Sequence, residues 1–141
     1  MAVDNPTFWL AVEDQEDDFF LLERACLRIQ PRPKLHWAQD GLQAKSYLAG
    51  EGQFGDRQMF PLPGLILCDV KMPYCNGFEL LAWVKQTPHL AEIAFVILTN
   101  SNSPADREQA NRLGADEFVV KPGAVADLRN VIQEVSERHV G

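Results

Sequence analysis

The sequence is short of basic residues and of long apolar runs. Its 13 lysine and arginine residues are outnumbered by 20 acidic residues, which gives a formal net charge of −7. A nucleic-acid-binding surface needs a clustered basic patch, so this balance argues against a nucleic acid as partner. No apolar run reaches the roughly 18 residues that a membrane-spanning helix needs. Residues 1–7 also lack the charged and apolar regions of a signal peptide.

Cysteine is scarce as well. Cys26, Cys68 and Cys75 make an odd number, and their spacing fits no metal-binding pattern. Together with the missing export signal, they indicate reduced thiols and a cytoplasmic protein. Cys26 and Cys68 are expected to be small buried apolar residues. Cys75 is expected in a loop, where a redox role stays open.

The chain does have a fivefold alternation between short apolar segments and amphipathic segments of helical length. With 141 residues, 46% of them hydrophobic, it is expected to form one domain with a sizeable core. Such alternation is typical of an α/β fold, in which helices cover both faces of a parallel sheet. The expected strands are residues 8–12, 35–38, 65–68, 93–98 and 117–120, and the expected helices are 16–30, 42–48, 78–86, 104–113 and 125–138.

Local signals support these helices. Asp40 is expected to cap the second helix, with Gln43 returning the bond of a capping box. Ser103 is expected to begin the fourth helix and Gly114 to end it. Residues 50–64 read as a long polar loop. The first helix has a predicted core stripe at Phe19, Leu22, Cys26 and Ile29.

Polar residues follow four of the five expected strands at their carboxyl ends. They are Glu13 and Asp14 after the first strand, Asp69 after the third, Thr99 after the fourth and Lys121 after the fifth. Open α/β sheets bind ligands in the crevice beyond these strand ends. Three carboxylates cannot share a pocket without a counter-charge, and a hard divalent cation supplies one. The pattern therefore predicts a Mg²⁺ site.

Such a site can position a phosphoryl group for in-line attack by a carboxylate. The metal and Lys121 would neutralise its oxygens, Thr99 would donate a hydrogen bond, and an aspartate can be the covalent nucleophile. Each residue alone has a simpler interpretation. Glu13 and Asp14 can be helix-capping acids, Thr99 a turn residue and Lys121 a solvated lysine. Their shared position at strand ends favours the site.

With these motifs the chain resembles the receiver domain of bacterial response regulators, in particular the small single-domain type associated with phytochrome kinases. The resemblance covers residues 7–137 and implies one receiver domain over 1–141, with no output domain. It also implies a flavodoxin-like, doubly wound, five-stranded parallel sheet in the order 2-1-3-4-5 with five helices. The motifs are Val12-Glu13-Asp14, Asp69 with Met72-Pro73 and Gly77, Leu98-Thr99, Gly114-Ala115 and Lys121-Pro122.

The resemblance assigns roles at the predicted metal site. Asp69 would be the phosphoacceptor. Mg²⁺ would be bound directly by Asp14 and Asp69 and through water by Glu13. The backbone carbonyl of Lys71 would complete the protein ligands.

The same resemblance implies a switch. Lys121 would pair with the phosphoryl group, and its bond to Pro122 would be cis. Thr99 would follow the phosphoryl oxygen and move the loop after the fourth strand. Phe118 would turn inward on activation, so that phosphorylation shifts a two-state equilibrium.

Three residues depart from the family pattern. Asn100 follows Thr99 where a small residue is more frequent, Lys71 is placed to lie over the phosphoryl group, and Gly123 loosens the turn into the last helix. These departures bear on the lifetime of the phosphoryl-aspartate and leave the chemistry in place.

The implied function is a phosphorylation-dependent signalling switch in a two-component phosphorelay. Its chemistry would be limited to its own phosphorylation and dephosphorylation, so the chain is not expected to be an enzyme. Its partners would be a sensor histidine kinase or histidine phosphotransfer protein and a downstream protein. A homodimer through residues 106–138 stays open, as does the choice for Phe20 between a core position and a kinase contact.

Two other functions remain as alternatives. One is a phosphorylation-independent interaction module of the same fold, against which the complete set of site residues speaks. The other is a Mg²⁺-dependent phosphohydrolase of the haloacid-dehalogenase type. Such enzymes usually carry a second acid two residues after the nucleophile, and here that position is Lys71. No glycine-rich phosphate loop is present either.

Overall fold

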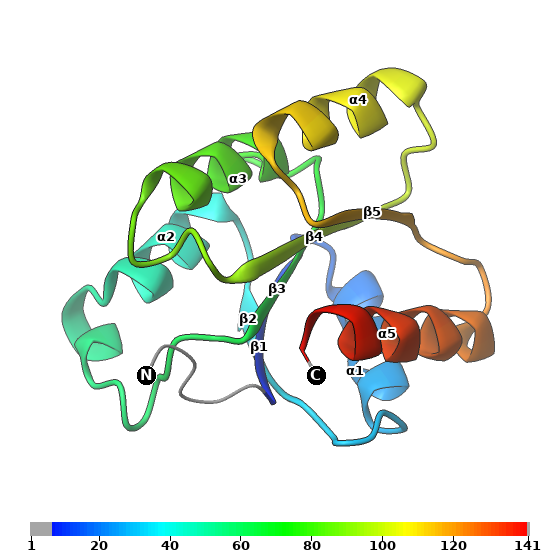
Figure 1. Cartoon of the computed structure of the whole chain (residues 1–141). Coiled ribbons are helices and arrows are strands. Elements are labelled where there is room, and N and C mark those ends of the chain that lie inside the picture. Colours follow the sequence, from blue (N-terminus) through cyan, green and yellow to red (C-terminus); the bar gives the residue numbers. More distant parts are fainter. Residues whose placement is uncertain (1–6, 141) are drawn as a thin grey trace.

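The computed structural model describes residues 7–140 and arranges them as a parallel sheet between two layers of helices (Figure 1). The strands are β1 (Phe8–Val12), β2 (Lys34–Ala38), β3 (Leu65–Cys68), β4 (Ala94–Thr99) and β5 (Glu117–Val120). The helices are α1 (Glu16–Cys26), α2 (Gly41–Ala49), α3 (Gly77–Gln86), α4 (Pro104–Leu113) and α5 (Val125–His139), with a short 3₁₀ helix, η1 (Gly52–Gly55). The strand order is β2-β1-β3-β4-β5, which confirms the predicted flavodoxin-like fold.

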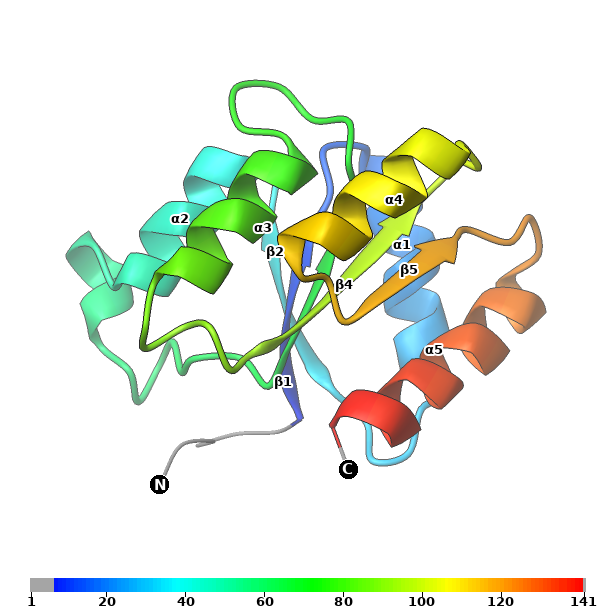
Figure 2. The ribbon, with the colours of Figure 1, turned by 45° about the horizontal axis from the view of Figure 1, so that its top comes forward.

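The helices are divided between the two faces of the sheet. Helices α1 and α5 lie side by side on one face, and α2, α3 and α4 cover the other (Figures 1 and 2). Because successive strand residues point to opposite faces, Trp9 joins the α1–α5 core while Leu10 joins the core under α2 and α3. All four residues of β3 are buried, as expected for a strand covered on both sides.

Helix α1 is shorter than predicted. Its core stripe is confirmed, because Phe19, Leu22, Cys26 and Ile29 are all buried. The helix nevertheless ends at Cys26, where the N–H groups of Arg28 and Ile29 switch to carbonyls three residues back. Phe20 is 49% exposed, so a core position for it is wrong. It follows Phe19 on the helix and is rotated about 100° away from the buried stripe.

The predicted helix ends are largely confirmed. The Asp40 side chain accepts from the Gln43 N–H and begins α2. The Gln43 side chain accepts from the N–H of Gln39 at 2.8 Å, one residue earlier than the expected capping box. Ser103 caps α4, and Gly114 ends it with a φ of 94°, a conformation that glycine adopts without strain.

Aromatic packing anchors the segment 50–64, which was expected to be a polar loop. The Phe54 ring of η1 lies 5.2 Å from that of Tyr47 in α2, and Phe60 lies 5.1 Å from Phe54. Arg57 donates hydrogen bonds to the carbonyls of Tyr47 at 3.0 Å and Leu48 at 2.8 Å. These carbonyls belong to the end of α2, where a helix leaves acceptors without intrahelical partners. The segment is therefore fixed to α2.

The same aromatic cluster contains His36 of β2. Its ring lies 4.5 Å from Tyr47 and 5.7 Å from Phe54. Burial lowers the pKa of His36 below its usual 6.5, because the charged imidazolium is poorly solvated there. As the pH falls below about 6.5, the imidazole of His36 is therefore protonated more readily in the unfolded chain than in the folded protein. Folding stability should fall as the pH drops through about 6.5, until the folded-state pKa is passed.

His36→Phe is expected to reduce this loss of stability in acid. Urea unfolding of the native protein and the variant at about pH 7.5 and about pH 5 measures the effect. The difference in unfolding free energy between the two pH values should be smaller for the variant. His89→Gln, at an exposed residue, is the matched control and should behave like the native protein. An equal acid loss in His36→Phe would show that another group is responsible.

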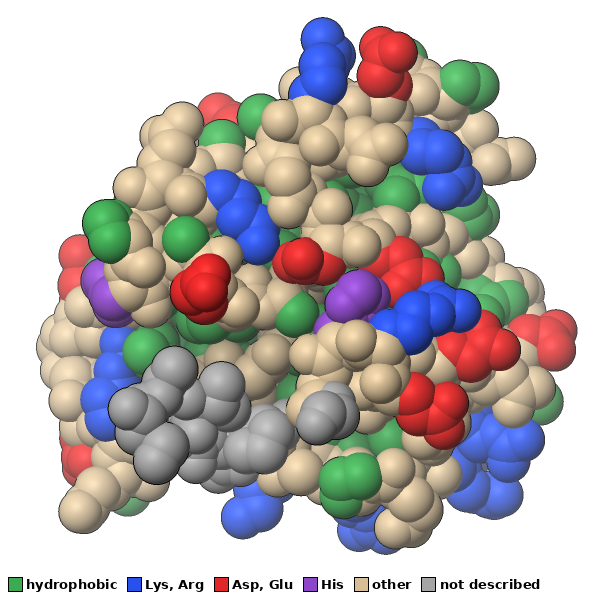
Figure 3. Space-filling view, in the orientation of Figure 1, with side chains coloured by type: hydrophobic (Ala, Val, Ile, Leu, Met, Phe, Trp, Pro, Cys, Tyr) green, Lys and Arg blue, Asp and Glu red, His purple; other side chains and the backbone are tan. Residues whose placement is uncertain are grey.

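The charged surface is mixed. On the face shown in Figure 3, lysine and arginine side chains are interspersed with acidic ones, and the coloured side chains form no broad basic patch. Within residues 7–140, no helix has both the length and the apolar character needed to cross a membrane.

Candidate functional site

The predicted site residues meet at the carboxyl edge of the sheet. Glu13 and Asp14 follow β1, Asp69 follows β3, Thr99 ends β4 and Lys121 follows β5. Glu13, Asp69 and Thr99 are buried, whereas Asp14 is half-buried at the rim. Parallel strands end at the same edge, which is why residues up to about a hundred positions apart come together here.

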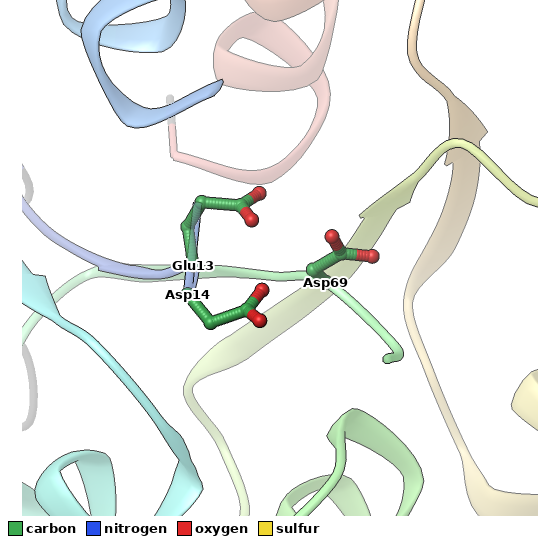
Figure 4. A group of neighbouring side chains, drawn as sticks. All are labelled: Glu13, Asp14 and Asp69. Carbon is green, nitrogen blue, oxygen red and sulfur yellow. The ribbon is translucent and has the colours of Figure 1, made fainter. Parts of the chain in front are cut away.

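Three carboxylates converge at this edge. Figure 4 shows Glu13 and Asp14 extending from the end of β1 toward Asp69. One ligand oxygen of each lies within 4.8 Å of the others, so this cluster could bind a metal ion. An all-oxygen donor set suits hard cations such as Mg²⁺. The three predicted carboxylate ligands are therefore brought together.

A pocket of about 350 Å³ opens beside the carboxylates. Its lining includes Asp14, Asp69 and Thr99, together with Lys71 and Asn100. Two of the three residues that depart from the family pattern thus border the space next to Asp69. Lys71 and Asn100 are exposed, so their side chains reach into solvent at the mouth of the pocket.

Lys121 holds the acids together. Its Nζ lies 2.6 Å from Glu13 Oε1, 3.1 Å from Asp18 Oδ2 and 3.2 Å from Asp69 Oδ2. Asp18, in the first turn of α1, is a site residue that sequence reasoning missed, because its acid was attributed to the helix dipole alone. The sequence carried no signal for this contact, because Asp14 precedes α1 and the spacing of the two acids does not by itself bring them together.

Burial and pairing shift the pKa values of the central ion pair. Burial raises the pKa of Glu13 to about 7, although the hydrogen bond and charge of Lys121 oppose the shift. Burial by itself would lower the pKa of Lys121. The hydrogen bond to Glu13 and the charges of Asp69 and Glu13 outweigh it, so the net pKa of Lys121 is raised. Lys121 therefore remains a cation.

A tight loop positions Asp69. Its Oδ1 accepts from the N–H of Val70 at 2.6 Å, and its own N–H donates to Val12 at 3.0 Å. The N–H of Gly77, at the start of α3, donates to the Val70 carbonyl at 2.9 Å. A Cβ atom on Gly77 would lie only 2.1 Å from the Asp69 carbonyl oxygen. Glycine is needed here because the loop folds back onto α3.

Thr99 connects the site to α4. Its Oγ1 accepts from the N–H of Ser101 at 3.2 Å. The Ser101 hydroxyl in turn donates to Asp106 Oδ2 in the first turn of α4 at 2.6 Å. The predicted switch residue thus sits at one end of a hydrogen-bonded chain to a helix.

The second predicted switch residue, Phe118, is half-buried on β5, at the edge of the sheet. The guanidinium carbon of Arg107 lies 4.7 Å from its ring centroid, a cation–π distance. Arg107 also donates to the Phe118 carbonyl at 3.4 Å. Helix α4 therefore holds Phe118 in its present position.

One expectation about the site is wrong. The bond between Lys121 and Pro122 is trans, and within residues 7–140 the cis bond joins Gln30 and Pro31. The Lys121 N–H continues the β5 ladder by donating to the Thr99 carbonyl at 2.7 Å. Lys121 Nζ reaches Glu13 and Asp69 with this bond in the trans form, which is the intrinsically preferred isomer even before proline.

Comparisons with known proteins agree with these features. The family model of the response regulator receiver domain matches residues 10–133. The chain is 31% identical over 142 residues to probable methanogenesis regulatory protein FilR2 of Methanothrix harundinacea, covering 100% of this chain and 88% of the relative. It is also 31% identical over 130 residues to response regulator Rcp1 of Synechocystis, covering 92% and 86%.

Solved structures show the same fold over nearly the whole chain. The phosphorylated cyanobacterial phytochrome response regulator RcpA has a TM-score of 0.86 at 26% identity, covering 96% of this chain and 94% of that one. The Mn²⁺-bound form of response regulator Rcp1 has a TM-score of 0.82 at 30% identity, covering 96% and 95%. The chain therefore belongs to the response regulator receiver domain family.

Proposed function

We propose that this receiver domain is a phosphorylation-dependent signalling switch that accepts a phosphoryl group on Asp69. The observation that carries the proposal is the position of Asp69 Oδ2, 3.2 Å from Lys121 Nζ and beside an open pocket. A carboxylate paired with a lysine in this way suits nucleophilic attack on phosphorus. The phosphodonor would be a sensor histidine kinase or a histidine phosphotransfer protein, as family membership implies.

The proposed step is an in-line displacement. An Asp69 carboxylate oxygen forms a bond to phosphorus while the bond between phosphorus and the donor's histidine nitrogen breaks. The electron pair of that bond returns to the imidazole nitrogen, which takes up a proton, and the product is an acyl phosphate. The Lys121 ammonium, already in contact with Asp69, would neutralise a phosphoryl oxygen.

The chemistry would depend on Mg²⁺. Asp14 and Asp69 would hold the ion directly, with Glu13 acting mainly through water and Lys71 through its backbone carbonyl. When bound, the ion would supply charge neutralisation at the phosphoryl oxygens. The converging carboxylate oxygens support this proposal, as does the Mn²⁺-bound form of the similar protein Rcp1.

The proposed switch runs from Thr99 to α4. A phosphoryl oxygen that attracts the Thr99 hydroxyl would draw Thr99 away from Ser101 and weaken the link to Asp106. Helix α4 would then shift, and Phe118 would leave Arg107 and turn inward. Phosphorylation acts here by favouring one of two arrangements.

The altered surface would be formed by α4, β5 and α5, over residues 106–138. A downstream protein or a second copy of the chain would read it. We place the reaction in the cytoplasm, where the three free cysteines would stay reduced. The chemistry would end with the phosphorylation and dephosphorylation of Asp69, without a separate substrate.

Site mapping tests the proposal directly. Incubation with Mg²⁺ and acetyl phosphate should increase the intact mass by one phosphoryl group. Borohydride reduction of the acyl phosphate should then convert Asp69 into homoserine, and peptide mapping should locate the homoserine at position 69. A label on Asp14 or Asp18 would contradict the assignment. An unchanged mass would favour the phosphorylation-independent interaction module.

Asp14→Ala is expected to weaken Mg²⁺ binding by more than about tenfold while leaving the fold intact. Asp14 is half-buried at the rim and forms no ion pair within residues 7–140, so its removal costs little packing. Isothermal titration with Mg²⁺ and far-ultraviolet circular dichroism measure the two properties. Asp17→Ala, which removes the same charge from an exposed position on α1, is the control and should bind normally. Native affinity in Asp14→Ala would place the metal elsewhere.

A further inference from the structure

Lys121 is shared by three carboxylates at the candidate site. Its Nζ lies 2.6 Å from Glu13, 3.1 Å from Asp18 and 3.2 Å from Asp69. An ammonium group has three N–H donors, so these acids occupy all of them. A phosphoryl oxygen on Asp69 can pair with Lys121 only if it displaces one of these contacts. The identity of the displaced acid therefore bears on the reaction.

Asp18 is the acid that can leave Lys121 at the smallest cost. The Glu13 side chain is 7% exposed, and its second oxygen accepts from the N–H of Gln15 at 3.2 Å. Release of Glu13 would leave a buried charge without its cation. The Asp18 side chain is 27% exposed, and within residues 7–140 its carboxylate bonds to Lys121 alone. Water can solvate it after release, and the dipole of α1 favours an acid in this first turn.

The surroundings of Asp18 leave room for such a movement. Asp18 lines the pocket of about 350 Å³ that also contains Asp69 and Thr99. It lines a second pocket, of about 200 Å³, together with Lys121. Its carboxylate thus faces open space on two sides. It also lies next to the position that a phosphoryl group on Asp69 would take.

We propose that Asp18 competes with the phosphoryl group for Lys121 and thereby restrains the phosphorylation of Asp69. Before the reaction, Asp18 holds one N–H of the ammonium group. As the phosphoryl group arrives, one of its oxygens takes that N–H, and the Asp18 carboxylate turns to solvent. Asp18 is then a positioning residue, because it acts through Lys121. The inference rests on the proposed function, since the competing anion is the group transferred to Asp69.

Asp18→Asn removes the competing charge and keeps an oxygen that can accept from Lys121. The ammonium group should therefore stay in place while its hold on residue 18 weakens. With Mg²⁺ and acetyl phosphate, phosphorylation followed by intact mass should be about fivefold faster than in the native chain, as loss of one partly exposed ion pair allows. A residue with a merely structural role would give an unchanged or slower reaction when replaced.

Two further variants separate the contact with Lys121 from general charge. Asp17→Asn removes the same charge from an exposed position in the same turn of α1 and should react at the native rate. Asp18→Glu restores a carboxylate and should return the rate to within about twofold of native.

Beryllofluoride, an analogue of the phosphoryl group, tests the competition at equilibrium. Fluorine-19 NMR measures the fraction bound to the protein in Mg²⁺. Asp18→Asn should reach half-saturation at an about fivefold lower concentration than the native chain. Asp17→Asn should bind like the native chain.

A native or slower rate in Asp18→Asn would overturn the inference, because a competitor's removal must speed the reaction. An equal acceleration in Asp17→Asn would also overturn it, since the effect would then come from net charge. Peptide mapping separates this inference from the proposed function. If Asp69 of the native chain carries no phosphoryl group, the proposed function fails, whatever the relative rates. If Asp69 is labelled at one rate in all variants, only the role of Asp18 is contradicted.

Discussion

Asp69→Asn is expected to abolish phosphorylation by acetyl phosphate completely. An asparagine amide cannot form the acyl phosphate that an aspartate forms. The remaining acids of the cluster are not equivalent, because Glu13 is bound to Lys121 at 2.6 Å and Asp14 lies at the pocket rim. Intact-mass measurement in Mg²⁺ and acetyl phosphate should show no added phosphoryl group.

The same variant should keep its fold. Asparagine can still accept the hydrogen bond from the Val70 N–H, and Lys121 retains Glu13 and Asp18 as partners. One negative charge fewer around Lys121 reduces repulsion among the acids. The free energy of unfolding should therefore be unchanged or higher by up to about 1 kcal/mol, as urea denaturation measures. If the Asp69→Asn protein were still phosphorylated, a residue other than Asp69 would be the acceptor. If it were unfolded, its loss of phosphorylation would say nothing about Asp69.

Gly77→Ala is expected to lower the free energy of unfolding by about 1–2 kcal/mol. The added Cβ would lie 2.1 Å from the Asp69 carbonyl oxygen and 3.0 Å from the Val70 Cα atom. Both neighbours are backbone atoms, which cannot rotate away as a flexible side chain would. Overpacking of this kind costs about 1–3 kcal/mol or more, which outweighs the roughly 1 kcal/mol by which alanine favours a helix.

Gly123→Ala provides the matched control. A Cβ at Gly123 meets nothing within 4 Å, and the residue has no positive φ. Alanine should therefore leave stability unchanged or raise it by up to about 1 kcal/mol, because it restricts the unfolded chain. Urea unfolding compares both variants with the native protein. Native stability in Gly77→Ala would show that the start of α3 lies farther from the Asp69 carbonyl than this contact requires.

Much of the site could be predicted because of how parallel sheets are built. Every strand ends at the same edge, so the acids after β1 and β3, the hydroxyl ending β4 and the lysine after β5 had to meet. The spacing of apolar segments fixed which residues stand at those ends. The strand order followed from the family resemblance, since alternation alone leaves the order of a parallel sheet open.

The remaining features depend on three-dimensional packing. Asp18 joins the site because α1 is inclined so that its first turn faces Lys121, and no sequence pattern gives that angle. Phe19 and Phe20 are both apolar, and only the rotation of α1 about its axis decides that Phe19 is buried.

The anchoring of residues 50–64 has a practical consequence. This segment joins the end of α2 to the beginning of β3, so it lies at the amino edge of the sheet, opposite Asp69. Its attachment through Arg57, Phe54 and Phe60 leaves Gln53 and Met59 exposed. A fluorescent label on either residue would be attached to a segment that packs on α2, at the opposite end of the strands from Asp69. Such a label could follow phosphorylation of the protein without altering any residue of the phosphoacceptor site.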